Sequence, residues 1–313
     1  MQSLEAFQLR IFKEINKSKI GKSIMVSPLS IYHILSLTTN GALNNTLSEM
    51  LLALNEKDIQ HMNTSNEKLS SIISELKTVE LANAVFTCFK PIESFISIIK
   101  KYQAEIKTLE SAEQVNKWCK EKTHNRIPKI LDNLNPDDLM VLINAIYFKG
   151  KWEKSFDKRR TRKDQFMNLN TTPKEILFMN KTDTFIYYEN NEIQAISLNY
   201  KEEDDLEALI ILPKIDKEKD INNYINNLTL EKYTNIIKKL SKQKVELRLP
   251  KFELNFEDEL RPHFNNLGMV QAFTNNADFS GISKTNNLKI SKIIHKTFLK
   301  LMKKELKQPL LLL

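Results

Sequence analysis

The chain has 313 residues, 41% of them hydrophobic, and a formal net charge of +8. This is enough apolar sequence for one large core. No apolar run is long enough to cross a membrane and none forms the centre of a secretory signal, so we expect no membrane partner. The location predicted is cytoplasmic, or extracellular by export without a leader, and the two cysteines, Cys88 and Cys119, are then expected as free thiols.

The residue pattern in the first half of the chain predicts mainly helices. Apolar residues at Leu4, Phe7, Ile11 and Ile15 have the spacing of an amphipathic helix. Ser27 and Pro28 are typical of a helix start, with a hydroxyl cap and a proline in the first turn. Further helices are expected over 44–54, 65–76, 91–107 and 111–122, with strands over 81–87 and 140–148.

The second half predicts mainly strands. Period-two or continuous apolar patterns lie at 184–188, 195–200, 206–212, 245–249 and 252–256, with two polar helices at 217–226 and 230–240. The basic run KRRTRK at 158–163 is interpreted as a solvated loop or face. The last predicted strand, 288–301, contains His295 at a position expected to be buried. A helical half followed by a strand-rich half indicates an α+β domain.

Few residues of the sequence form a pattern typical of a catalytic, metal-binding or phosphate-binding site. Ser27 or Ser30 with His295 could act as nucleophile and base, but no Gly-x-Ser-x-Gly turn accompanies them. A histidine in such a strand is otherwise an ordinary hydrogen-bonded core residue. The five histidines and two cysteines have no metal-ligand spacing, and no glycine-rich phosphate loop is present. We therefore expect no enzyme, no metal and no cofactor.

Several long motifs resemble the serpin family of protease inhibitors, in order and over nearly the whole chain. They are NNTLSEMLLAL at 44–54, LANAVF at 81–86, LGMVQAFTNNADFSGIS at 267–283, and four others: SIMVSPLSIY (23–32), VNKWCKEKTHNRI (115–127), LINAIYFKGKWEKSF (142–156) and VELRLPKFELNFEDEL (245–260). The resemblance implies an α+β serpin fold: a helical cluster around a large mixed β-sheet, with smaller antiparallel sheets. It also implies one domain over 1–301, with 302–313 as an aberrant, non-homologous tail.

The resemblance also implies roles for individual residues. Ser27, Ser30, Asn144 and His295 correspond to a hydrogen-bonded cluster, the shutter, beneath the centre of the main sheet, which can gate whether two strands part. Trp152 and Lys251 correspond to the breach, where the reactive loop first enters the sheet; the alternatives are an amphipathic anchor for Trp152 and a solvated strand end for Lys251. The hinge is expected to begin at Lys296, Thr297 and Phe298.

Family members of this kind inhibit proteases by strand insertion. A target protease cuts an exposed loop, is trapped as an acyl-enzyme, and the cut loop enters the sheet as a new strand. The partner implied is a serine or cysteine protease. Because residues 65–77, which correspond to a glycosaminoglycan-binding helix of some serpins, are nearly charge-balanced, heparin is not an expected partner, and neither is nucleic acid. The alternative is a degenerate or non-inhibitory serpin-fold binding protein.

The segment after Leu299 departs from the family pattern. Residues Lys300 to Leu313 can be encoded by codons that, with one G added in front, translate as Glu-Val-Asn-Glu-Glu-Gly-Thr-Glu-Ala-Ala-Ala-Ala-Thr-Ala. This is the hinge pattern of inhibitory serpins. We therefore expect a frameshift followed by truncation, with the reactive loop, its scissile bond and the C-terminal strands absent, and a chain that is inactive as an inhibitor as written.

Overall fold

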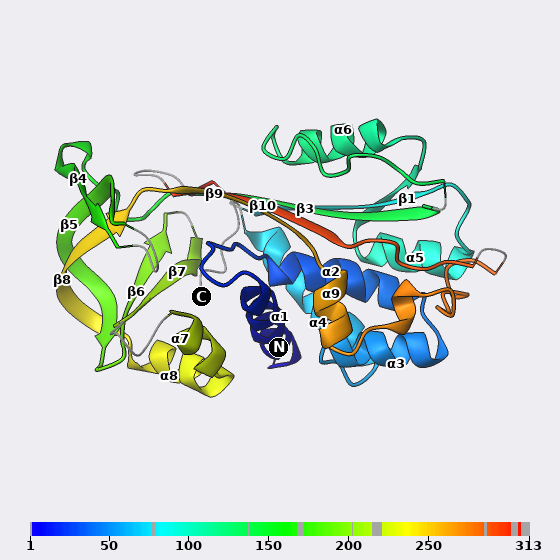
Figure 1. Ribbon diagram of the computed structural model, residues 1–313, viewed down its shortest axis with the longest axis horizontal. Coiled ribbons are helices and arrows are strands. Elements are labelled where there is room, and N and C mark those ends of the chain that lie inside the picture. Colours follow the sequence, from blue (N-terminus) through cyan, green and yellow to red (C-terminus); the bar gives the residue numbers. More distant parts are fainter. Residues whose placement is uncertain are drawn as a thin grey trace. The chain divides into compact units, whose positions relative to one another are not determined.

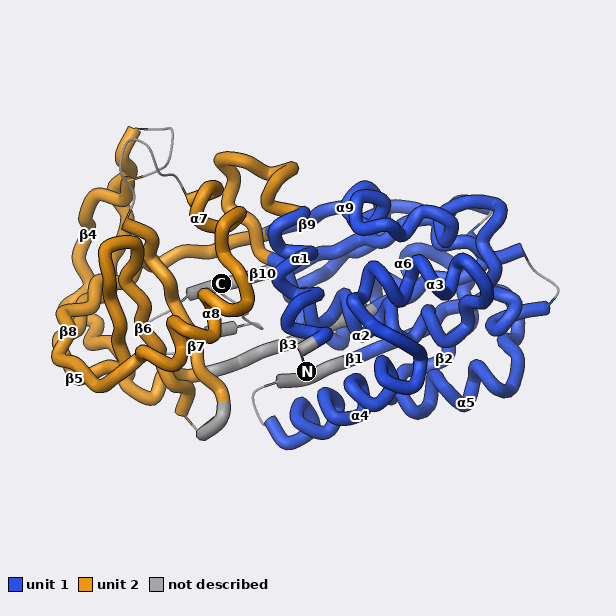
Figure 2. Tube along the Cα trace, turned by 90° about the horizontal axis from the view of Figure 1, so that it is seen from below, with its two compact units in different colours: residues 1–14, 26–147, 256–297 blue, residues 15–25, 148–255, 298–313 orange. Residues whose placement is uncertain are grey.

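The structure is a computed structural model that describes residues 2–76, 79–136, 138–167, 172–201, 203–214, 221–284, 287–301 and 306–307. The chain divides into two compact units (Figure 2). Unit 1 comprises residues 1–14, 26–147 and 256–297, and unit 2 comprises residues 15–25, 148–255 and 298–313. Among the described helices, none is long and apolar enough to cross a membrane.

Most helices lie close to their predicted positions, although α4 (Ile59–Glu75) begins at Ile59 rather than at residue 65. Phe7, Ile11 and Ile15 are fully buried, as the 3.6-residue spacing of the first helix predicts. Outside residues 148–255, the described helices are α1 (Gln2–Ser18), α2 (Pro28–Thr39), α3 (Asn44–Ala53), α4 (Ile59–Glu75), α5 (Glu93–Lys101), α6 (Ala112–Lys122) and α9 (Arg261–Asn266). The 3-10 turn η2 (Gln271–Phe273) follows α9. The helix α2 is buried at 11 of its positions rather than on one face.

Two local predictions were wrong. The helix expected over 91–107 ends at Lys101, and β2 (Ala104–Thr108) follows it as a strand. Gln103, with a φ of 53°, turns the chain between them. Ser27 precedes α2, but its side chain makes no cap hydrogen bond.

The larger sheet is mixed, as predicted. Its order is β2-β1-β3-β11-β10-β9, where β1 is Val79–Thr87, β3 is Met140–Gly150, β9 is Glu253–Glu259, β10 is Ile294–Leu301 and β11 is Leu306–Lys307. The strands β1 and β2 are parallel, whereas β11 is antiparallel to both β3 and β10. The strand predicted from Leu288 begins only at Ile294, although Leu288 and Ile290 are buried.

Unit 1 has helices on both faces of its strands. The helix α6 lies on one face of β1 and β3, and α2 lies on the other (Figure 1). Beneath α6 is a buried cluster contributed by β1, α6, the segment that follows it, and β3: Ala84, Phe86, Val115, Trp118, Cys119, Ile127, Ile130 and Ile143. This cluster supplies the main energetic reason for α6 to stay on the sheet.

Unit 2 contains a second, antiparallel sheet. Its strands are β4 (Thr161–Phe166), β5 (Lys174–Glu189), β6 (Ile193–Tyr200), β7 (Glu203–Pro213) and β8 (Ser241–Pro250), in the order β4-β5-β6-β7 with β8 paired to β5. The helices α7 (Ile221–Asn227) and α8 (Leu230–Lys239) pack Tyr224 and Ile236 against Ile193, Ala195 and Leu209. The basic run at 158–163 forms a short 3-10 turn, η1 (Lys158–Arg160), and the start of β4, and all but one of its residues are exposed, in agreement with the prediction of a solvated loop or face.

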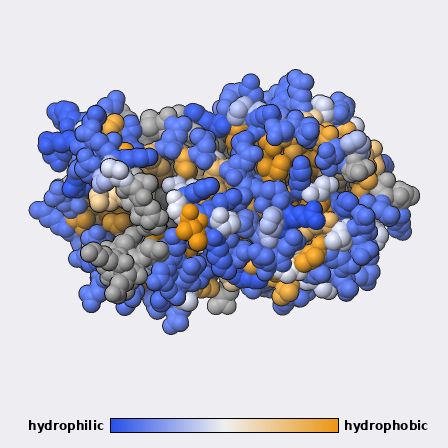
Figure 3. All heavy atoms as spheres, viewed as in Figure 1, coloured by the Kyte–Doolittle hydropathy of each residue, from blue (hydrophilic) through white to orange (hydrophobic). Residues whose placement is uncertain are grey.

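The surface is largely hydrophilic. On the face shown in Figure 3, hydrophobic side chains form small separate areas among polar ones. Isolated exposed apolar side chains of this kind, such as Leu52 at 61% and Leu177 at 40% exposure, are usual for water-soluble folds and indicate no specific site.

Candidate functional site

Ser27, Ser30 and His295 lie together in unit 1. The backbone N–H of Ser27 donates a hydrogen bond to Nε2 of His295 at 3.0 Å, and the hydroxyl groups of Ser27 and Ser30 are 2.8 Å apart. Each of the three residues is 7% exposed. The hydroxyl of Ser27 therefore forms a hydrogen bond with the hydroxyl of Ser30 instead of capping α2.

The same hydrogen bond determines the protonation state and the tautomer of His295. Because Nε2 accepts a hydrogen bond from an amide, the ring proton must be on Nδ1 and the imidazole must be neutral. Burial lowers the pKa of His295 to about 4, although the negative charge of Asp258 acts in the opposite direction. At neutral pH this residue is a fixed hydrogen-bond acceptor.

This arrangement does not support nucleophilic catalysis. The imidazole of His295 bonds to the backbone nitrogen of Ser27, whereas a general base would have to accept from a hydroxyl. A neutral ring whose pKa lies well below 7 is also a weak base at physiological pH. The geometry instead couples the start of α2 to β10. The side chain of Asn144, the fourth predicted member of this cluster, lies outside the described residues.

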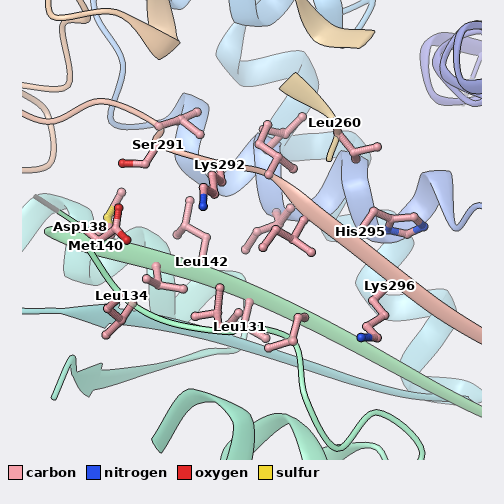
Figure 4. Close-up of a pocket in the computed structure, with 18 of the residues that line it drawn as sticks. Leu131, Leu134, Asp138, Met140, Leu142, Leu260, Ser291, Lys292, His295 and Lys296 are labelled. Carbon is pink, nitrogen blue, oxygen red and sulfur yellow. The ribbon is translucent and has the colours of Figure 1, made fainter. Parts of the chain in front are cut away.

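A cavity of about 340 Å³ opens beside this cluster, also within unit 1. One wall is the start of β3 (Met140, Val141, Leu142, Ile143) and another is the chain from Leu288 to Lys296. Four residues of α2 and residues 129–134 also line it: Ser30, Ile31, Ile34 and Leu35 from the helix, and Lys129, Ile130, Leu131, Asp132, Asn133 and Leu134. In Figure 4, Leu142 and Lys292 approach the cavity from its two long walls.

The cavity lies where the sheet lacks a strand. In the sheet order, β11 stands between β3 and β10, and its described residues pair with Lys149 and Gly150 at the end of β3 and with Lys300 and Leu301 of β10. The cavity lines the opposite end of β3, at Met140 to Ile143. Within the described residues, β11 therefore does not reach the end of β3 that lines the cavity. Leu306 and Lys307 belong to the predicted tail, and the boundary after residue 301 stays a prediction.

Trp152 and Lys251, the predicted breach residues, both belong to unit 2. Trp152 is 3% exposed and stacks on Tyr200, with ring centroids 5.0 Å apart and an interplanar angle of 13°. Burial also raises the pKa of Tyr200. The backbone of Lys251 donates to the carbonyl of Leu177 at 2.7 Å.

The predicted hinge entry lies on β10. Lys296 pairs with Glu257 of β9 at 2.7 Å, and Thr297 is 6% exposed. The side chain of Phe298 lies outside the described residues. The ion pair is partly exposed, so its contribution to stability is expected to be small.

A buried pair that the sequence analysis missed lies next to the cluster. Asp258 of β9 accepts a hydrogen bond from Nε2–H of His263 at 2.9 Å, and the two side chains are 10% and 6% exposed. A signal was present, because alternation along β9 places Asp258 on the same face as the buried Phe256. The carboxylate of Asp258 is the charge that acts on His295.

Comparisons with known proteins agree on one family. The family model "Serpin (serine protease inhibitor)" matches residues 2–308. Human Serpin B8 is 34% identical over 315 residues, which cover 93% of this chain and 82% of that protein. Cleaved Serpin 42Da superposes with a TM-score of 0.91 at 26% identity, covering 98% of this chain and 86% of the other. The thermophilic serpin tengpin, in its latent state, gives 0.87 at 30% identity, covering 98% and 86%.

Proposed function

Because this chain belongs to the serpin family, we propose that its form with a restored reactive loop is a protease inhibitor, rather than an enzyme, that works by accepting an extended segment as a new strand of its larger sheet. The chain as written is then inactive as an inhibitor, because it lacks that loop. The observation that carries this proposal is the cavity of about 340 Å³ between the start of β3 and the chain leading into β10. A strand added there would lie beside Met140 to Ile143 of β3 and Ile294 to Lys296 of β10, and would cover the apolar side chains among the lining residues.

The cluster at His295 supports the same function. If β3 and β10 part to admit a strand, β10 keeps β9 as its neighbour in the sheet, and a contact outside the sheet adds to this attachment. The hydrogen bond from Ser27 to His295 attaches β10 to the buried start of α2. Since that bond needs only a neutral imidazole, it can persist while the sheet opens.

The target that we propose is a serine or cysteine endopeptidase. Such an enzyme forms a covalent acyl intermediate with the segment that it cuts. Insertion of the cut segment into the sheet would move the attached protease before water releases it. No catalytic group of the inhibitor takes part in this sequence.

A synthetic peptide tests strand acceptance. The peptide Gly-Thr-Glu-Ala-Ala-Ala-Ala-Thr-Ala, carrying a fluorophore, is incubated with the full chain, and a version with proline at every second position is the control because proline cannot donate to a strand ladder. We expect one peptide to bind per chain, and at a hundred times its Kd to raise the free energy of unfolding by about 2.7 kcal/mol. Equal binding of both peptides, or of neither, would contradict strand acceptance.

A chimera tests inhibition. The chain up to Leu299 is joined to the part of Serpin B8 that follows the corresponding position, and the product is mixed with a panel of serine and cysteine proteases. We expect an adduct that survives denaturing electrophoresis. Cleavage of the chimera without an adduct would instead favour a non-inhibitory binding protein of the same fold.

A further inference from the structure

A second cavity, of about 400 Å³, lies entirely within unit 2. It is lined by the chain that follows β3, by β5 and β6, and by the start of β8. Its volume is in the range of small-molecule sites. The proposed strand acceptance does not use this cavity, because that function involves the cavity beside the start of β3 in unit 1.

One part of the wall of the unit 2 cavity is apolar and mostly buried. The apolar lining residues are Trp152, Phe156, Phe185, Ile186 and Leu198. The ring of Trp152 is held in place by its stacking contact with Tyr200. The next residue along the chain, Glu153, donates its backbone N–H to the carbonyl of Asn199 at 2.9 Å. The apolar wall is therefore formed before any ligand binds, and it suits the hydrocarbon part of a small molecule.

Two lysines and one acid line the same cavity. The ammonium group of Lys154 donates to the carbonyl of Thr184 at 2.7 Å and lies 3.4 Å from the carboxylate of Asp183. Lys242 is exposed, and its ammonium group makes no ion pair or hydrogen bond with the described residues. Glu153 supplies the negative charge. The lining therefore has a net positive charge, and Lys242 carries the cation that is left for a ligand.

The strand register places this cation beside the apolar wall. Lys242, near the start of β8, is the partner of Ile186 of β5. An ammonium group next to apolar surface attracts a carboxylate more strongly than one surrounded by water, because less water screens the pair. A neutral ligand would gain nothing from Lys242, and a cationic ligand would be repelled by it. The charge and the apolar wall together select a ligand that is both apolar and anionic.

From this arrangement we propose that the unit 2 cavity binds an apolar carboxylate. Its hydrocarbon part lies against Trp152, Phe185 and Leu198, and its carboxylate pairs with Lys242. The site is separate from strand acceptance, so either function can fail without the other. Aromatic acids and medium-chain fatty acids share this chemistry, and the test therefore includes one of each.

Equilibrium dialysis of the full chain against 2-naphthoate and against decanoate tests the site, with 2-naphthamide as the uncharged control ligand. We expect one carboxylate to bind per chain, and 2-naphthamide to bind at least about tenfold more weakly than 2-naphthoate. Tighter binding of 2-naphthoate would identify aromatic acids as the ligand class, and tighter binding of decanoate would identify fatty acids. Equal binding of 2-naphthoate and 2-naphthamide, or no binding of either acid up to about 1 mM, would overturn the proposal.

Substitutions locate the binding site. Lys242→Met removes the cation but keeps a long side chain, and Lys244→Met is the matched control, since Lys244 is exposed on the same strand and is not a lining residue. We expect the Kd of the carboxylate to rise about tenfold in Lys242→Met and to stay unchanged in Lys244→Met. Glu153→Gln removes a like charge and should lower that Kd about threefold. Equal losses in the two lysine variants would overturn the site, because they would indicate attraction by the general surface charge.

Discussion

The backbone N–H of Ser27 donates to Nε2 of His295 at 3.0 Å, across 268 positions of sequence. The start of α2 and β10, which lie far apart in the sequence, are therefore joined by a hydrogen bond that exists only while the imidazole is neutral. This makes the attachment of β10 to α2 sensitive to acid. It also makes the contact a useful target for substitution.

Stability should fall in acid because of His295. An unfolded histidine titrates near pH 6.5, whereas burial lowers the pKa of His295 to about 4. As pH falls through this interval the unfolded state binds a proton that the native state does not. The free energy of unfolding should therefore decrease by about 3 kcal/mol between pH 7 and pH 4.

The measurement is urea denaturation at several pH values, with His295→Gln as the control. Glutamine keeps an acceptor for Ser27 but cannot titrate. His33, whose pKa burial also lowers, adds a loss of the same sign in both proteins. The difference between the two curves isolates His295, and parallel curves would contradict the assignment.

The serine pair should behave as a coupled unit. Replacing Ser27 or Ser30 by alanine leaves the other hydroxyl, which is 2.8 Å away and buried, without this partner. We expect each single substitution to cost about 1 to 2 kcal/mol and the double substitution to cost less than their sum, with a coupling of about 1 kcal/mol. A double-mutant cycle from denaturation curves checks this, and strict additivity would count against the contact.

Filling the cavity should block the peptide without unfolding the protein. Leu142 lines the cavity on β3, so Leu142→Trp places a larger side chain in the space of about 340 Å³. We expect peptide affinity to fall at least about tenfold while the free energy of unfolding changes by less than about 2 kcal/mol. The control is Leu177→Trp, at a position on β5 that is 40% exposed. Unchanged affinity for Leu142→Trp would show that the peptide binds elsewhere.

The periodicity of apolar residues correctly predicted the helices and strands that are determined by their own local sequence. Phe7, Ile11 and Ile15 form one stripe, and α1 buries all three. Residues 104–108 failed because their strand exists through parallel pairing with Asn83 to Thr87, which no pattern inside the segment reports. The cap predicted for Ser27 failed because its hydroxyl bonds to the hydroxyl of Ser30, three residues further on, instead of to a backbone amide of α2.

The candidate site also contains some features that the sequence could reveal and others that it could not. Ser27, Ser30 and His295 could be grouped because their surrounding motifs resemble a known family, and the structure brings these three together. The cavity wall formed by residues 129–134 could not be predicted, because it arises from tertiary placement, which no single motif encodes.

Trp152 should contribute strongly to the stability of unit 2, whatever its role in strand entry. Its ring is 3% exposed and stacked on Tyr200 at 5.0 Å between centroids. Truncation removes both the buried area and the aromatic contact, so we expect Trp152→Ala to lower the free energy of unfolding by about 3 to 5 kcal/mol. Trp152→Phe keeps a ring and should cost less than half as much. Denaturation followed by circular dichroism measures both, because the substitutions remove a fluorescent reporter, and similar losses for the two variants would show that stacking is not the source of the stability.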